Sequence, residues 1–76
     1  MTEFKTPDLY MAAMLITVGV PFLRLDKVGQ RGFFVFDAQA EDFEDLKHGW
    51  FSGSMEVSAL EYASKIKHLK NLVMNF

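Results

Sequence analysis

The hydrophobic and polar positions divide the chain into an apolar opening helix, a hairpin and two further helices. Residues 7–18 are apolar at most positions. Thr6 is expected to cap this helix, Pro7 suits the first helical position and Asp8 complements the positive helix end. Gly19 is the natural stop. Because the helix is apolar on nearly every side, we expect it to be central to a core or shared with a partner subunit.

The middle of the chain predicts a β-hairpin. Residues 22–26 and 33–37 are rich in apolar and aromatic side chains, and residues 27–32 between them contain two glycines. The second strand is apolar on both faces, which carry Phe34 and Phe36 on one side and Phe33 and Val35 on the other. We expect one face to meet the helices and the other to lack an evident cover.

Two helices are predicted after the hairpin. Asp37 is expected to cap the first of them, and residues 52–54 to end it. Its apolar positions recur at helical spacing at Ala40, Phe43, Leu46 and Trp50. Ser58 and Glu61 fit a capping box, so the last helix should begin there and continue to about Met74. Its apolar stripe consists of Tyr62, Ile66, Leu69, Val73 and Phe76.

These elements predict an α+β fold in the order α-β-β-α-α, with the hairpin packed on helices and one domain over residues 1–76. A chain of 76 residues buries a modest core, and the absence of cysteine excludes both disulfides and cysteine-based zinc sites. Dense apolar packing or oligomerisation must therefore supply stability. The apolar run 9–18 is too short to span a membrane and no secretory signal is evident, so we expect a cytoplasmic protein.

Composition argues against an enzyme. The chain has no nucleophile elbow, and its glycines match no phosphate-binding or dinucleotide-binding spacing. Glu41, Asp45 and His48 share one helix face and could hold a metal, but we favour a solvated acidic face, since acids near a helix start have a structural reason to be there. We therefore expect no catalytic residues, no metal and no cofactor.

The hairpin carries the candidate binding residues. Arg24, Lys27 and Arg31 lie on or beside strands that carry Phe22, Phe33 and Phe34, and Phe33 is the expected stacking residue. Positive charge beside aromatic rings is what single-stranded nucleic acids need for phosphate contacts and base stacking. The net charge of −2, however, provides no overall attraction to nucleic acid. With Val35 on the same face as Phe33, these five residues are equally candidates for a protein interface.

Several segments resemble a short domain of unknown function found in bacteria, phages and mobile elements. The segments are the opening residues 4–10 (FKTPDLY), the strand 33–37 (FFVFD), and residues 50–53 (WFSG) followed by Val57 and a helix with Leu69 and Lys70. The resemblance covers nearly the whole chain. It implies a bacterial or phage source and carries no activity.

The leading hypothesis is a non-enzymatic, self-associating interaction domain that serves as an accessory factor. A hairpin of two strands is marginal alone and leaves its edges unpaired, and pairing across a two-fold axis would satisfy them. A homo-oligomer, with a dimer favoured, is therefore the expected assembly. The alternative is an accessory protein that binds single-stranded nucleic acid through the hairpin.

Overall fold

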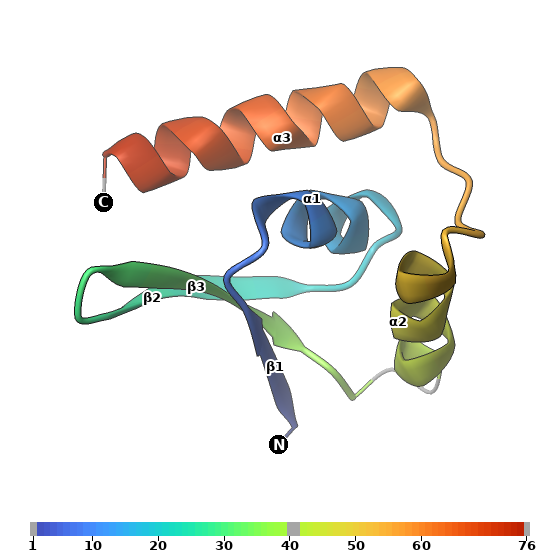
Figure 1. The fold of residues 1–76 in the computed structure, drawn as a ribbon, viewed down its shortest axis with the longest axis horizontal. Coiled ribbons are helices and arrows are strands. Elements are labelled where there is room, and N and C mark those ends of the chain that lie inside the picture. Colours follow the sequence, from blue (N-terminus) through green and yellow to red (C-terminus); the bar gives the residue numbers. More distant parts are fainter. Residues whose placement is uncertain (1, 40–41, 76) are drawn as a thin grey trace.

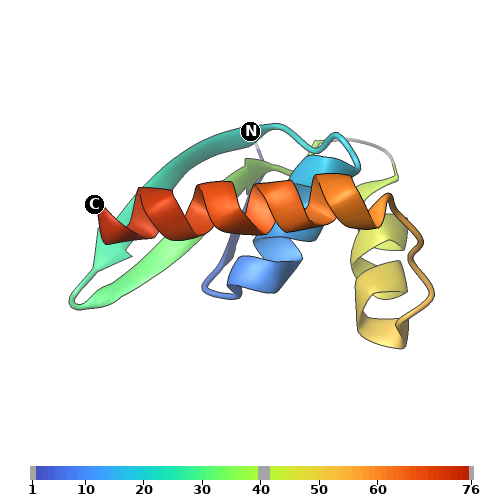
Figure 2. The same ribbon diagram turned by 90° about the horizontal axis from the view of Figure 1, so that it is seen from above.

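The computed structural model describes residues 2–39 and 42–75, which form three strands and three helices. In chain order the elements are β1 (Glu3–Thr6), α1 (Leu9–Thr17), β2 (Phe22–Val28), β3 (Arg31–Asp37), α2 (Phe43–Ser52) and α3 (Ala59–Met74). The α1 helix lies between the sheet and the first half of α3, and α2 stands at the side (Figure 1). Seen from above, α3 crosses over both α1 and the sheet (Figure 2). The α+β class is confirmed, with the order β-α-β-β-α-α.

The first strand, β1, is absent from the order predicted from the sequence. The sheet is antiparallel in the order β1-β3-β2, so β3 is central, and Phe4 and Thr6 of β1 pair with Phe36 and Phe34. A strand of four residues is too short to be predicted from its pattern. Pro7, directly after it, is typical of a helix start, so the preceding residues were assigned to the approach to that helix. The prediction that the hairpin stands alone is therefore wrong, because β1 covers one edge of β3.

The start of α1 also differs from the prediction. Thr6 is the last residue of β1, and its Oγ1 accepts a hydrogen bond from the backbone N–H of Asp8 at 3.1 Å. Asp8 is the helix cap, and its Oδ1 accepts from Tyr10 and Met11 at 2.9 and 3.2 Å. A residue before proline is held extended, which explains why Thr6 stays in the strand.

Gly19 ends α1 as predicted. With φ of 97°, Gly19 adopts the left-handed conformation that glycine takes without steric cost. The Gly19 N–H donates to the Ile16 carbonyl at 3.0 Å, and the Val20 N–H to the Leu15 carbonyl at 2.9 Å. This pair of bonds is a Schellman motif, and both Leu15 and Val20 are buried in the core.

The hairpin turn is tighter than predicted. β2 continues to Val28 and β3 begins at Arg31, so only Gly29 and Gln30 form the loop. Gly29 has φ of 63°, as expected for glycine at the first loop position of a type II′ turn. The predicted turn at 27–32 was too long because Gly32, taken for a turn residue, lies inside β3.

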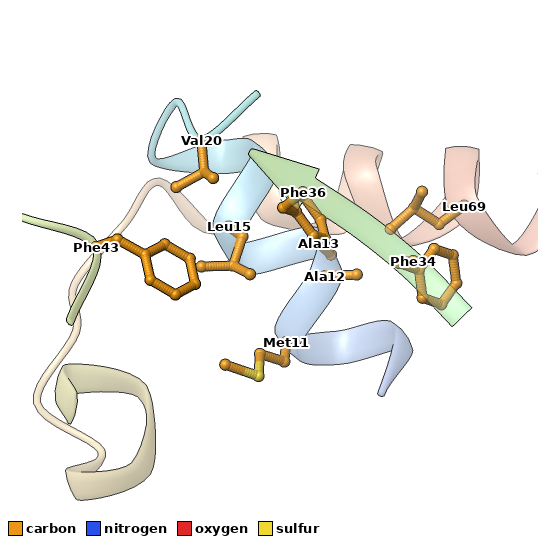
Figure 3. Packing of buried hydrophobic residues seen from close by; sticks show 9 residues of the cluster. All are labelled: Met11, Ala12, Ala13, Leu15, Val20, Phe34, Phe36, Phe43 and Leu69. Atoms are coloured by element: carbon orange, nitrogen blue, oxygen red, sulfur yellow. The ribbon is translucent and has the colours of Figure 1, made fainter. Parts of the chain in front are cut away.

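The core lies between the sheet and the helices. Phe34 and Phe36 share one face of β3, as the alternation predicted, and this is the face that points towards α1, with Phe36 fully buried (Figure 3). The α1 helix is central to this core, as its nearly all-round apolar character predicted. The buried cluster comprises Met11, Ala12, Ala13, Leu15, Val20, Phe34, Phe36, Phe43 and Leu69.

Three of the four ends of α2 and α3 lie where the sequence predicted them, and the start of α2 does not. The Ser58 hydroxyl caps α3 by accepting from the Glu61 N–H at 3.4 Å, and α3 ends at Met74, both as predicted. Gly53 ends α2, also as predicted. Asp37 does not cap α2, because it is the last residue of β3 and its carboxylate accepts from the Gln39 N–H at 3.0 Å.

The α2 helix is held mainly at its first residue. Phe43 is buried, and its ring centroid lies 5.2 Å from that of Phe4 in β1. The Nζ of Lys47 lies 5.6 Å from the centroid of the Phe4 ring. Ala40, which the sequence assigned to this helix, lies outside the described residues. Over the described residues, no helix has both the length and the apolar character needed to cross a membrane.

Candidate interaction surfaces

The outer face of the sheet, turned away from the helices, carries a network of four charged side chains. Arg24 of β2 donates two hydrogen bonds to Glu3 of β1, at 2.9 and 3.0 Å. The Nε of Arg24 donates to the Asp26 carboxylate at 2.9 Å. Asp26 also pairs with Lys5 of β1, whose Nζ lies 3.4 Å from Oδ2. The network therefore links the two edge strands and has no net charge.

This network covers the central strand. Arg24 and Lys5 lie directly opposite Val35, one on each side of it. An ion pair between β1 and β2 must pass over β3, and the Arg24–Glu3 and Lys5–Asp26 pairs both do so. Val35 is consequently 0% exposed, although it faces away from the helices. The expectation that this face lacks a cover is wrong, since aliphatic stems and paired charges provide one.

The pKa values of the two carboxyl groups respond to the same network. The pKa of Glu3 and the pKa of Asp26 are both lowered, in each case chiefly because Arg24 donates hydrogen bonds to the charged carboxylate. A carboxyl whose pKa is lower when folded contributes stability above its unfolded pKa and loses that contribution as the pH falls through the folded pKa. The network is therefore stabilising at neutral pH and is lost in acid.

Replacing Arg24 by glutamine should show this pH dependence directly. The Arg24→Gln variant is expected to unfold at lower urea concentration than the parent at pH 7, because both carboxylates lose their main donor. The difference should shrink as the pH falls below about 4, where carboxyl groups become protonated. Urea melts at pH 7, 5 and 3 measure it. A difference that stays constant or grows in acid would contradict the role given to the network.

The five residues selected from the sequence do not form one cluster of free groups. Arg24 is held by Glu3 and Asp26, and Val35 lies beneath the network. Lys27 is opposite Gly32 and engages in further interactions. Arg31 is exposed beside the hairpin turn, and Phe33 is partly buried on the outer face, opposite Asp26. Glu3 and Lys5 were missed, because the four residues of β1 are too short a segment to predict a strand from the sequence.

Alanine substitutions at Phe33 and Phe34 test which face of β3 is turned towards the helices. Phe33→Ala should cost about 1–2 kcal/mol, because part of the ring is already in water. Phe34→Ala, the matched substitution on the inner face, should cost about 3–5 kcal/mol, since Phe34 is 2% exposed. Urea melts of the two variants give the comparison. A larger loss for Phe33 than for Phe34 would reverse the assignment.

The geometry of Arg24 bears on nucleic-acid binding. The Arg24 guanidinium already donates three hydrogen bonds to two carboxylates, and the negative charge of these carboxylates opposes the approach of a phosphate. Binding to single strands through Arg24, Lys27, Arg31 and Phe33 stays a prediction, and fluorescence anisotropy with mixed oligonucleotides at about 50 mM salt tests it.

A groove of about 390 Å³ lies where the start of α1, the turn end of β3 and the last turns of α3 meet. Its lining is mainly apolar, and its two charged residues are Asp8 and Arg31. Asp8 is already engaged as the cap of α1. The lining residues are Pro7, Asp8, Leu9, Arg31, Gly32, Phe34 and Val73.

The long edge of the sheet is formed by β2. Among residues 2–39 and 42–75, this seven-residue strand pairs with β3 alone, whereas the opposite edge strand, β1, has four residues. Leu23 and Val28, near its two ends, are 42% and 64% exposed. An unpaired strand presents a row of backbone donors and acceptors that another chain can use. The β2 edge is therefore the part of the sheet best suited to association.

Comparison with known protein families, curated proteins and solved structures gives no match. The resemblance to a short bacterial and phage domain thus stays an expectation. The candidate metal group also stays untested, because Glu41 lies outside the described residues. Within residues 2–39 and 42–75, no three His, Cys, Asp or Glu side chains are placed to hold a metal ion.

Proposed function

We propose that this chain is a non-enzymatic interaction domain that associates with itself, a dimer being the favoured assembly. The open edge of β2 carries the proposal. One side of this seven-residue strand completes the hairpin, and the other has no partner strand among the described residues. A sheet with a long open edge gains hydrogen bonds by pairing, and a two-fold axis closes the assembly at two copies.

The surroundings of β2 support association with a protein partner. Leu23 and Val28 expose apolar surface at the edge, and the outer face beside it is neutral overall because its charges are paired. A neutral, ion-paired surface does not attract a polyanion such as a nucleic acid. It can, however, pack beside the same surface of a second copy, because opposite charges can be placed next to each other. We further propose that the domain is of bacterial or phage origin and acts in the cytoplasm as an accessory factor.

Light scattering coupled to size-exclusion chromatography tests the proposal. At micromolar concentrations the mass should be twice the chain mass of 8.7 kDa, and it should fall towards the chain mass on dilution. Strictly monomeric protein over the whole concentration range, together with a cooperative thermal melt, would overturn self-association.

A further inference from the structure

The hydrogen-bonding direction of β2 can be derived from the hairpin turn. Val28 and Arg31 flank the two-residue loop, and the flanking pair in such a hairpin exchanges both backbone bonds. Bonding residues alternate along an antiparallel pair, so Asp26 is again directed at β3. Leu25 and Lys27 therefore present their N–H and C=O groups to the open edge.

The charges along β2 select one way of pairing two copies. In an antiparallel dimer, a two-fold axis at Leu25 places Arg24 of each copy opposite Asp26 of the other. An axis at Asp26 would instead set the two Asp26 carboxylates opposite each other, and axes at Arg24 or Lys27 would do the same with two cations. Like charges directly opposite destabilise a strand pair, and opposite charges stabilise it.

We infer that two copies of this chain pair through β2, with the two-fold axis at Leu25 and with Arg24 and Asp26 forming ion pairs across it. This inference rests on the self-association proposed above and specifies its interface. The two Leu25 residues, whose backbone groups both face the edge, then form the central hydrogen-bonded pair. On the outer face, the network of Glu3, Arg24, Asp26 and Lys5 continues into that of the second copy.

The two edges of the sheet limit both the length of this pairing and the addition of further copies. The register of β2 shifts between Phe22 and Arg24, which leaves Leu23 as an extra residue without a partner in β3. Such a bulge twists the edge and limits regular pairing to the segment that follows it. The remaining edge, β1, has only four residues, of which two are charged.

Single cysteines test the position of the axis. The chain contains no cysteine, so any disulfide formed reports on the introduced thiol alone. In a hydrogen-bonded antiparallel pair the Cα atoms lie about 5.5 Å apart, which a disulfide spans. Leu25→Cys should give a covalent dimer on mild oxidation. Leu23→Cys and Val28→Cys are the controls, since two residues from the axis already separates the copies' Cα atoms by about 14 Å.

Charge reversal supplies an independent test if the Leu25 variant folds poorly. Arg24→Glu and Asp26→Lys each set like charges across the axis, so each variant alone should weaken the dimer at least about tenfold. An equal mixture of the two should regain parental affinity, because every pair across the axis is then opposite in sign. Both variants also lose ion pairs within the subunit, but mixing cannot restore those. Sedimentation equilibrium of the single variants and the mixture provides the affinities.

The outcomes separate this inference from the function on which it rests. A dimeric parent whose Leu25→Cys variant does not cross-link faster than the controls, and whose charge variants do not recover on mixing, would overturn the register but leave self-association standing. A parent that is monomeric at every concentration would overturn both.

Discussion

Phe36→Ala is expected to remove a large part of the folding stability of this domain. The Phe36 side chain is 0% exposed in the central strand, and its ring centroid lies 5.4 Å from that of Phe22. Truncating a buried phenylalanine costs about 3–5 kcal/mol through lost burial and the cavity that remains. A natural domain of this length has a free energy of unfolding of roughly 4–11 kcal/mol, at about 0.05–0.15 kcal/mol per residue.

Phe51→Ala is the matched control for this experiment. Phe51 lies on α2 and is 74% exposed, so the same chemical change should alter the free energy of unfolding by less than about 0.5 kcal/mol. Urea melts followed by circular dichroism, at equal protein concentration, measure both variants. Equal losses at the two positions would mean that β3 does not form the centre of the core.

Leu69→Ala is also expected to lower the stability strongly, because Leu69 is the buried residue of α3. It is 0% exposed and belongs to the cluster that contains Phe34 and Leu15. Replacing a buried leucine by alanine costs about 2–5 kcal/mol, although alanine itself favours the helix. The loss should appear in urea melts, and amide hydrogen exchange should show the residues of α3 exchanging faster.

Leu60→Ala provides the comparison within the same helix. Leu60 is 82% exposed near the start of α3, so its replacement should be nearly neutral. Helix propensity and composition change identically in the two variants, which leaves burial as the difference. If Leu60→Ala proved the more damaging change, α3 would have to present its opposite face to the core.

Local signals in the sequence predicted the elements whose ends are fixed by their own residues. Gly19 ends α1 and Ser58 begins α3 through bonds within a few residues of each position, so the chain pattern contains the information. The alternation along β3 similarly placed Phe34 and Phe36 on one face and Phe33 and Val35 on the other, although it did not decide which face is the inner one. These features need no knowledge of distant partners.

The features that the sequence did not reveal depend on contacts between distant positions. β1 has only four residues and becomes a strand by pairing with β3, thirty or so residues later in the chain. The cover over Val35 requires an ion pair between Glu3 and Arg24, and no local sequence pattern predicts this pair. Arg24 therefore appeared from the sequence as a cation available to phosphate, whereas it belongs to an ion-paired network.

The pairing of β1 (Glu3–Thr6) with β3 should also protect this protein against aggregation. β3 contains three phenylalanines and one valine in succession, a composition typical of segments that stack into fibrils when both edges are open. β1 closes one of those edges, and Pro7 and Asp8 connect it to α1. Displacement of β1 from the sheet would expose this edge of β3, and with it a run of apolar residues that favours intermolecular β-pairing.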